Sequence, residues 1–245
     1  MARFPNPNPF GPSQPYGLDY AAPDQSAIIA RFFNSVYAWM AAGLALTAVV
    51  AWYVAANFGL IFNTIGLGGL LGLFVLQLIL VFTISAAVQR ISAPVATALF
   101  LLYAALNGVT LSGIVLAYTH AAIASAFLVT AGMFGAMSIY GFVTRRDLSA
   151  WGSLLFMGLI GLILASVVSL FWHNSLLQVG INYLGVLIFV GLTAYDTQRL
   201  KVIAVQTAGV PQLASRLAIS GALALYLDFL NLFLFLLRAM NGNRR

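Results

Sequence analysis

The sequence predicts an all-α integral membrane protein with seven transmembrane helices, and two observations carry this prediction. First, 62% of the 245 residues are hydrophobic and only 7% are charged, which is too little charge to cover the surface of a water-soluble domain. Second, the apolar residues fall into seven stretches, each long enough to cross a hydrocarbon core of ~30 Å as a helix. These stretches are 32–56, 66–89, 94–118, 121–143, 151–172, 179–202 and 217–238.

Three regions follow from this pattern. Residues 1–30 are rich in Pro, Asn and Gly, which predicts a disordered tail, and they lack the basic region and apolar run of a cleaved signal peptide. Residues 31–240 form the predicted transmembrane domain, and 241–245 a short basic tail. The brief connections at Arg90–Pro94 and Tyr118–Ala122 predict tight antiparallel hairpins.

Small residues recur inside the apolar stretches, for example at Gly132 and Gly135 and again at Gly158 and Gly161. Lipid provides no hydrophobic drive between helices, so small residues serve to let helix backbones approach closely. We interpret these glycines as packing positions.

Basic residues predict the orientation, because Lys and Arg near helix ends are retained on the cytoplasmic side. Eight of the eleven fall on one side of a seven-span topology, which predicts a cytoplasmic N-terminus and a bacterial inner membrane location. These eight are Arg3, Arg31, Arg90, Arg145, Arg146, Arg199, Lys201 and Arg216. Arg238, Arg244 and Arg245 break the pattern: either the C-terminus is exported despite its charge, or the last segment folds back, and we favour seven full crossings.

Several function classes are disfavoured by the sequence. The chain has no cysteine, which excludes disulfides, thiolate chemistry and zinc sites built on cysteine. The basic residues are scattered through connections rather than gathered on one face, so nucleic acid is not expected as a partner. There is no phosphate loop, nucleophile elbow or His-Glu-x-x-His motif, so we expect neither an enzyme nor a bound cofactor.

The acidic residues are few and all are aspartate. Asp19 and Asp24 lie in the tail and Asp147 lies beside two arginines in a connection, where a solvated surface charge is the simplest interpretation. Asp196 and Asp228 fall within predicted membrane helices. An acid inside the membrane is a candidate functional residue.

Asp228 lies near the middle of the last stretch, where an ionised carboxylate costs at least ~2.5–3.5 kcal/mol, so it should face protein or water and have a partner. If the sixth helix extends to about Gln206, Asp196 lies ~15 Å deep, close to the ~18 Å of Asp228 counted from Arg216. The structural alternative is an aspartate that only joins helices, for instance through Arg199, three residues after Asp196.

Two carboxylates in one site cannot both ionise cheaply, so such a pair can hold a single shared proton. When deprotonated, the pair offers hard oxygen ligands to a cation such as Ca²⁺. Neighbouring side chains that could add neutral oxygens or orienting hydrogen bonds are Asn231, Gln198, Thr193 and Tyr195.

Four segments resemble the bacterial branch of the transmembrane Bax inhibitor motif family. They are AYDTQRLK at 194–201, ALYLDFLNLF at 224–233, LNGVTLS at 106–112 and WMAAGLALT at 39–47. The match covers about residues 30–240, and the two aspartate segments are its most specific parts.

The resemblance implies six helices packed around a central seventh and a calcium leak path gated by an aspartate pair, which corresponds here to Asp196 and Asp228. It also implies that an arginine of the second helix latches the closed state, for which Arg90 is the only candidate, with Arg199 a second cation beside the pair. Related proteins often carry an acid in the second helix, where this chain has Gln77. Some bacterial relatives are associated with a membrane-anchored AAA protease.

These inferences lead to the hypothesis of a pH-sensitive, passive Ca²⁺ leak channel, with calcium and protons as the partners of the aspartate pair. Two rivals remain open. The same pair would suit a proton-coupled cation antiporter, and the chain could instead be a non-transporting regulator that binds other membrane proteins, such as a membrane-anchored protease.

Overall fold

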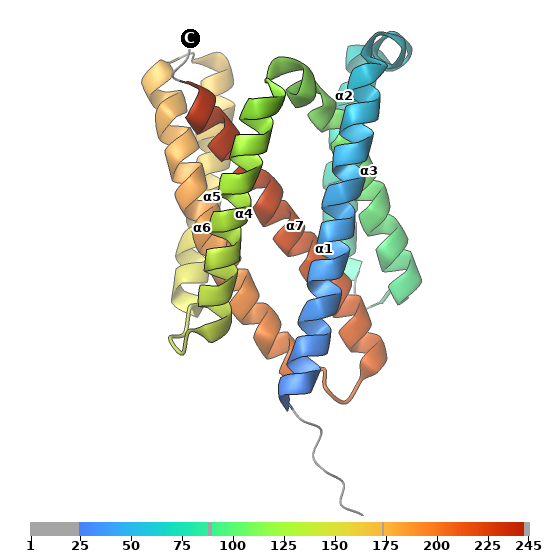
Figure 1. The fold of residues 1–245 in the computed structure, drawn as a ribbon, viewed down its shortest axis with the longest axis vertical. Helices are drawn as coiled ribbons and strands as arrows, with labels where there is room; N and C mark the ends of the chain where they lie inside the picture. Colours follow the sequence, from blue (N-terminus) through green and yellow to red (C-terminus); the bar gives the residue numbers. More distant parts are fainter. Residues whose placement is uncertain (1–24, 88–89, 173, 243–245) are drawn as a thin grey trace, which may run out of the picture.

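The computed structural model describes residues 25–87, 90–172 and 174–242, and these residues form a bundle of seven α-helices (Figure 1). The helices are α1 (Gln25–Ala56), α2 (Phe58–Ala87), α3 (Ala93–Ala117), α4 (His120–Val143), α5 (Ser149–Phe171), α6 (Ser175–Gln206) and α7 (Pro211–Asn241). Each contains most of one predicted stretch, which confirms the predicted fold class. Of the described helices, all except α2 are long and apolar enough to cross a membrane as single continuous segments.

The predicted tails are shorter than expected where they can be compared. Helix α1 begins at Gln25, inside the range 1–30, and α7 includes Asn241, inside the range 241–245. Residues 1–24 and 243–245 lie outside the described residues, so the prediction of a disordered tail stays a prediction for them.

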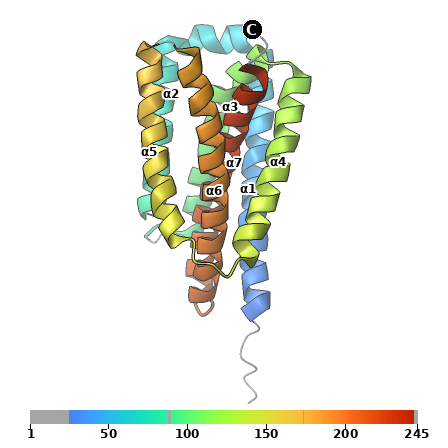
Figure 2. The ribbon, with the colours of Figure 1, turned by 90° about the vertical axis from the view of Figure 1, so that its left-hand side faces the viewer.

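Helix α2 consists of two parts that meet at Gly66. The backbone there has φ 63° and ψ −177°, a conformation that residues with a Cβ rarely adopt. The part before Gly66 lies across one end of the bundle, and the part after it runs back along the bundle beside α3 (Figure 2). The predicted crossing at 66–89 therefore begins at the kink. The helical segment before Gly66 was not predicted, because those residues fell between two predicted stretches.

Helix α7 is the central helix. It packs against α1, α3, α4 and α6, and it carries the largest set of buried side chains in the bundle. Helices α2 and α5 pack mainly on α3 and α6, on the outside of this group. Figure 1 shows α7 running obliquely through the middle of the bundle, as expected for a central helix surrounded by the others.

The two ends of the bundle differ in charge. The start of α1 and the connections 144–148 and 207–210 lie at one end, which we call the basic end because Arg145, Arg146 and Lys201 are there. Helix α7 finishes at the opposite end (Figure 1). The described part of the last helix thus runs the full height of the bundle and does not fold back.

A buried hydroxyl pair joins three helices in the core. The Thr47 hydroxyl donates to the Ala104 carbonyl oxygen at 2.8 Å, and it lies 2.7 Å from the Tyr226 hydroxyl. Because the Thr47 hydrogen is already used, the Tyr226 hydroxyl is the donor in the second bond. The Phe100 ring packs edge-on against the Tyr226 ring, so α1, α3 and α7 are fixed together at this point.

We expect replacement of Thr47 by valine to lower the free energy of unfolding by about 0.6–1.7 kcal/mol, the average and the maximum measured for interhelical hydrogen bonds in a membrane protein. The change leaves the Tyr226 hydroxyl and the Ala104 carbonyl without their shared partner. Equilibrium unfolding in detergent micelles measures the loss. Thr47→Ser keeps the hydroxyl and serves as the control. Equal losses in the two variants would show that the methyl group, not the hydrogen bonds, is responsible.

Candidate functional site

The two membrane aspartates come from α6 and α7. Helix α6 extends beyond the predicted stretch 179–202, through the apolar residues 202–205 to Gln206, which places Asp196 about 15 Å along the helix from this end. Asp228 lies about 26 Å along α7 from Pro211. The two can still meet because α7 is inclined to the long axis of the bundle (Figure 1). The depth of a residue of α7, measured along that axis, is therefore smaller than its distance along the helix.

The Asp196 and Asp228 carboxyl groups are hydrogen-bonded to each other. Asp228 is only 5% exposed, and its Oδ2 atom has no hydrogen-bond partner among the described residues. Asp196 is half-buried. A hydrogen bond between two carboxyl groups requires a proton on one of them, so the arrangement corresponds to a pair that shares one proton.

The two described cavities of the bundle lie apart from the aspartate side chains in their lining. One cavity of about 570 Å³ lies between α1, α4 and α7, and one of about 250 Å³ lies where α1, α3, α4 and α7 meet. Neither is lined by Asp196 or Asp228.

The cation nearest to the pair by charge interaction is Arg199. Its positive charge acts on Asp196 from three residues further along α6, and its side chain is exposed. Arg90, the candidate latch of the second helix, follows the end of α2 and is also exposed. Among the described residues, no interaction is found between Arg90 and either aspartate, so the structure brings Arg199, but not Arg90, to the pair.

Two of the predicted neutral ligands bond to their own helices. The Thr193 hydroxyl is buried and donates to the Phe189 carbonyl oxygen at 2.8 Å. The Asn231 amide nitrogen donates to the Leu227 carbonyl oxygen at 2.8 Å, which leaves its own side-chain oxygen as the atom that could orient a neighbour.

The Gln198 side chain binds the connection between α4 and α5. Its side-chain oxygen accepts from the Leu148 backbone N–H at 2.8 Å, and its nitrogen donates to the Arg146 carbonyl at 2.7 Å. Both polar ends thus fasten the connection 144–148 to α6. Tyr195 also faces the neighbouring helix, because a Cβ added at Gly152 in α5 would overlap its ring.

Lys201 makes a contact with Phe142 that was not predicted from the sequence. Its ammonium group donates to the Phe142 carbonyl oxygen at 2.9 Å and lies 5.1 Å from the centre of the Phe142 ring. It therefore stabilises the last turn of α4, where unpaired carbonyl groups favour a cation. From the sequence alone, Lys201 is a charge near a helix end, and nothing specifies α4 as its partner.

The connection between α4 and α5 contains Asp147, which behaves as a surface charge. Its side chain accepts from the Ser149 backbone N–H at 2.9 Å, and hydrogen bonds to the side chain and backbone of Ser149 hold the pKa of this carboxyl below its usual range. Asp147 stays ionised near neutral pH and offers a control for the membrane aspartates.

Gln77, at the position where related proteins often carry an acid, is buried and its amide nitrogen donates to the Thr110 hydroxyl at 3.3 Å. Among the described residues there is no group of three or more His, Cys, Asp or Glu side chains that could hold a metal ion. A cation at the pair would therefore have two carboxyl groups as its charged ligands, with water or neutral oxygens completing its shell.

Comparison with known proteins shows the family of this chain. A family model described as "Inhibitor of apoptosis-promoting Bax1" matches residues 29–245. The chain is 53% identical over 218 residues to "Inner membrane protein YbhL" of Escherichia coli K12, covering 87% of this chain and 92% of that protein. It is also 50% identical over 214 residues to an uncharacterized protein of Deinococcus radiodurans, with coverage of 87% and 91%. An uncharacterized protein of Borreliella burgdorferi is 44% identical over 218 residues, with coverage of 88% and 93%.

The matched region contains all of the described bundle after the first turn of α1, including both membrane aspartates. With an all-helical bundle of apolar helices and a family model that covers most of its length, this chain belongs to the Bax inhibitor-1-like family of membrane proteins.

Proposed function

We propose that this protein is a passive, pH-sensitive cation leak channel with Ca²⁺ as its permeant ion, in which Asp196 and Asp228 form the gate. The observation that carries this proposal is the hydrogen bond between the two carboxyl groups in the interior of the bundle, with Asp228 only 5% exposed. A buried acid costs several kcal/mol unless it is protonated or paired, and this pair adds nothing to the packing that apolar residues would not supply. A role in moving protons or cations explains its presence.

In this mechanism the shared proton keeps the carboxyl groups together while the path is closed. Loss of the proton leaves two adjacent negative charges, which either separate or take up a cation. The unpartnered Oδ2 of Asp228 is the oxygen available to such an ion. Arg199 lies beside Asp196 and acts as the candidate latch by competing with the cation for that carboxylate.

The same proposal places the protein in a bacterial inner membrane with the basic end in the cytoplasm. The positive-inside rule supports this orientation, because most of the described basic residues lie at the end where α1 begins. The E. coli relative is named an inner membrane protein.

The test is Ca²⁺ flux into proteoliposomes that contain only this protein, followed with an enclosed dye. The pH should be varied from about 5 to about 8, because a carboxyl pair that shares one proton can lose that proton within this range. We expect the native chain to conduct in a pH-dependent way and Asp196→Asn or Asp228→Asn to remove that dependence. Asp147→Asn removes an exposed charge from a connection and should behave as the native chain.

Absence of flux at every pH would contradict the channel and favour a non-transporting regulator that binds another membrane protein. Flux that requires an opposing proton gradient would instead identify an antiporter, because a passive leak runs down the Ca²⁺ gradient alone. The two results are separated by collapsing the proton gradient with an ionophore.

A further inference from the structure

The larger cavity lies on the side of the bundle where α1 and α4 stand apart. These helices meet edge to face at Phe33 and Phe142, with ring centres 5.1 Å apart, and both pack on α7. Between them is a space of about 570 Å³, which Phe229 of α7 lines from within. This volume falls in the range of ~300–1,000 Å³ that is typical of ligand pockets.

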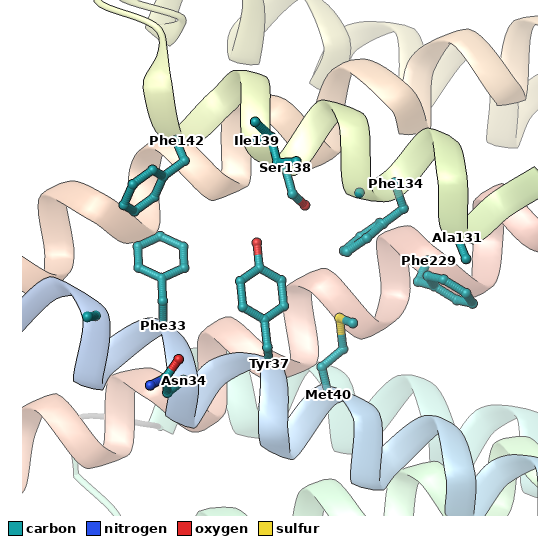
Figure 3. Close-up of a pocket in the computed structure, with 12 residues that line it drawn as sticks. Phe33, Asn34, Tyr37, Met40, Ala131, Phe134, Ser138, Ile139, Phe142 and Phe229 are labelled. Atoms are coloured by element: carbon teal, nitrogen blue, oxygen red, sulfur yellow. The ribbon is translucent and has the colours of Figure 1, made fainter.

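The lining is mostly apolar, with polar groups from Tyr37 and Ser138 in the middle and from Asn34 beside Phe33. Figure 3 shows aromatic rings at one end and Phe134, Met40 and Phe229 at the other, with the hydroxyl groups of Tyr37 and Ser138 directed into the space between them. A ligand that fits must therefore be mostly apolar and carry a hydrogen-bonding oxygen.

Ser138 is the observation that points to a ligand. It is 6% exposed, and its hydroxyl has no hydrogen-bond partner. Every other buried serine or threonine among the described residues donates to a backbone carbonyl, as Thr130 does to Ala126 on the same helix. The Ser138 hydroxyl faces the cavity instead (Figure 3), and a buried hydroxyl without a partner costs about 1–3 kcal/mol.

The position of Ser138 specifies which part of a ligand it meets. It lies about 8 Å along α4 from Val143, at the basic end. The headgroup region adds roughly 5–8 Å to each side of the hydrocarbon core, so Ser138 lies close to the level where the acyl chains of a phospholipid join their ester groups. An ester carbonyl is an acceptor that suits the Ser138 hydroxyl.

Basic residues lie next to lining residues at the same end of the cavity, in space or along the chain. The Lys201 ammonium lies over the Phe142 ring, which lines the cavity, and its bond to the Phe142 carbonyl uses only one of its three hydrogens. Arg31 follows the lining residue Ala30 and is exposed, and Arg145 follows the end of α4. An anionic headgroup complements these charges.

We propose that this cavity binds one anionic phospholipid from the bilayer. One acyl chain fills the space between α1 and α4, its ester carbonyl accepts from Ser138, and its phosphate lies near Lys201 and Arg31. The inference does not depend on the proposed channel function, because neither membrane aspartate lines the cavity.

Two glycines of α4 provide a matched pair of variants. Gly135 lines the cavity and Gly132 does not, and a Cβ added at either position meets no atom within 4 Å. Gly135→Leu therefore adds apolar volume to the cavity from a position where its Cβ has room, whereas Gly132→Leu adds the same side chain to the same helix at a position that does not line the cavity. Both proteins are expected to fold.

The experiment is native mass spectrometry of the delipidated protein in detergent, titrated with phosphatidylglycerol or with phosphatidylcholine of identical acyl chains. We expect one phosphatidylglycerol to bind the native chain and Gly132→Leu, with affinity lowered about tenfold or more in Gly135→Leu and lowered to a smaller extent in Ser138→Ala. Phosphatidylglycerol with a photoreactive acyl chain should label residues of α1 and α4.

Equal binding to Gly135→Leu and Gly132→Leu would overturn the assignment of the cavity. Equal affinity for the two lipids would overturn the assignment of the phosphate to Lys201 and Arg31, and so would a Lys201→Gln variant that binds phosphatidylglycerol as the native chain does. Labelling confined to other helices would also contradict the proposal, and none of these outcomes bears on Ca²⁺ flux.

Discussion

Gly141→Ala is expected to lower the free energy of unfolding by about 3 kcal/mol, at the upper end of what overpacking usually costs. Gly141 is buried where α4 crosses α6, and a Cβ at this position would overlap the carbonyl group of Ala194. Backbone atoms inside a helix cannot rotate away as a flexible side chain does. The methyl group is therefore accommodated only if the two helices move apart.

The measurement is equilibrium unfolding in detergent micelles, with Gly132→Ala as the matched control on the same helix. A Cβ at Gly132 meets no atom within 4 Å, so alanine there should be neutral or slightly stabilising through its helix propensity. Similar stabilities for the two variants would contradict the close approach of α4 and α6.

The same contact affects the aspartate pair. Ala194 is two residues before Asp196, so separating α4 from α6 displaces the segment that carries this carboxyl. Gly141→Ala should therefore alter the pH dependence of any flux in the surviving folded protein, whereas Gly132→Ala should not.

Much of the fold could be predicted because lipid constrains a chain strongly. Every backbone polar group must be satisfied within the membrane, so long apolar stretches become helices, and their number follows from the sequence. The extension of α6 to Gln206 was also predictable, because residues 202–205 are apolar. The helical segment before the turn at Gly66 was not, because the short segment between the stretches 32–56 and 66–89 was expected to be a connection.

The two charged residues of the candidate site could be predicted from the sequence, but the hydrogen-bond partners of the polar residues around them could not. Asp196 and Asp228 stand out because ionisable residues within membrane helices are rare. Gln198 has the same side chain whether it faces an ion or a connection, and only the three-dimensional structure shows that it binds residues 146 and 148. Ser138 could not be distinguished from other helical serines in the sequence. It stands out only because its buried hydroxyl has no hydrogen-bond partner, which the structure alone shows.

Ca²⁺ binding to the aspartate pair is expected to strengthen as pH rises and to release protons. A cation and the shared proton compete for the same carboxyl oxygens, so the bound form predominates only where the proton has been lost. Calorimetric titration of Ca²⁺ in two buffers of different ionisation enthalpy gives both the affinity and the number of protons released. In Asp228→Asn the charged pair is lost, and affinity should fall about tenfold or more with little remaining proton release.

Asp147→Asn is the control for this experiment. Because its hydrogen bonds with Ser149 lower the pKa of Asp147, this carboxyl is already ionised across the range and cannot supply the released protons. The substitution should leave both affinity and proton release unchanged. If native protein bound Ca²⁺ equally well at low and high pH, or if Asp228→Asn still released protons on binding, the cation would not be taking the place of the shared proton and the gate would require another titrating group.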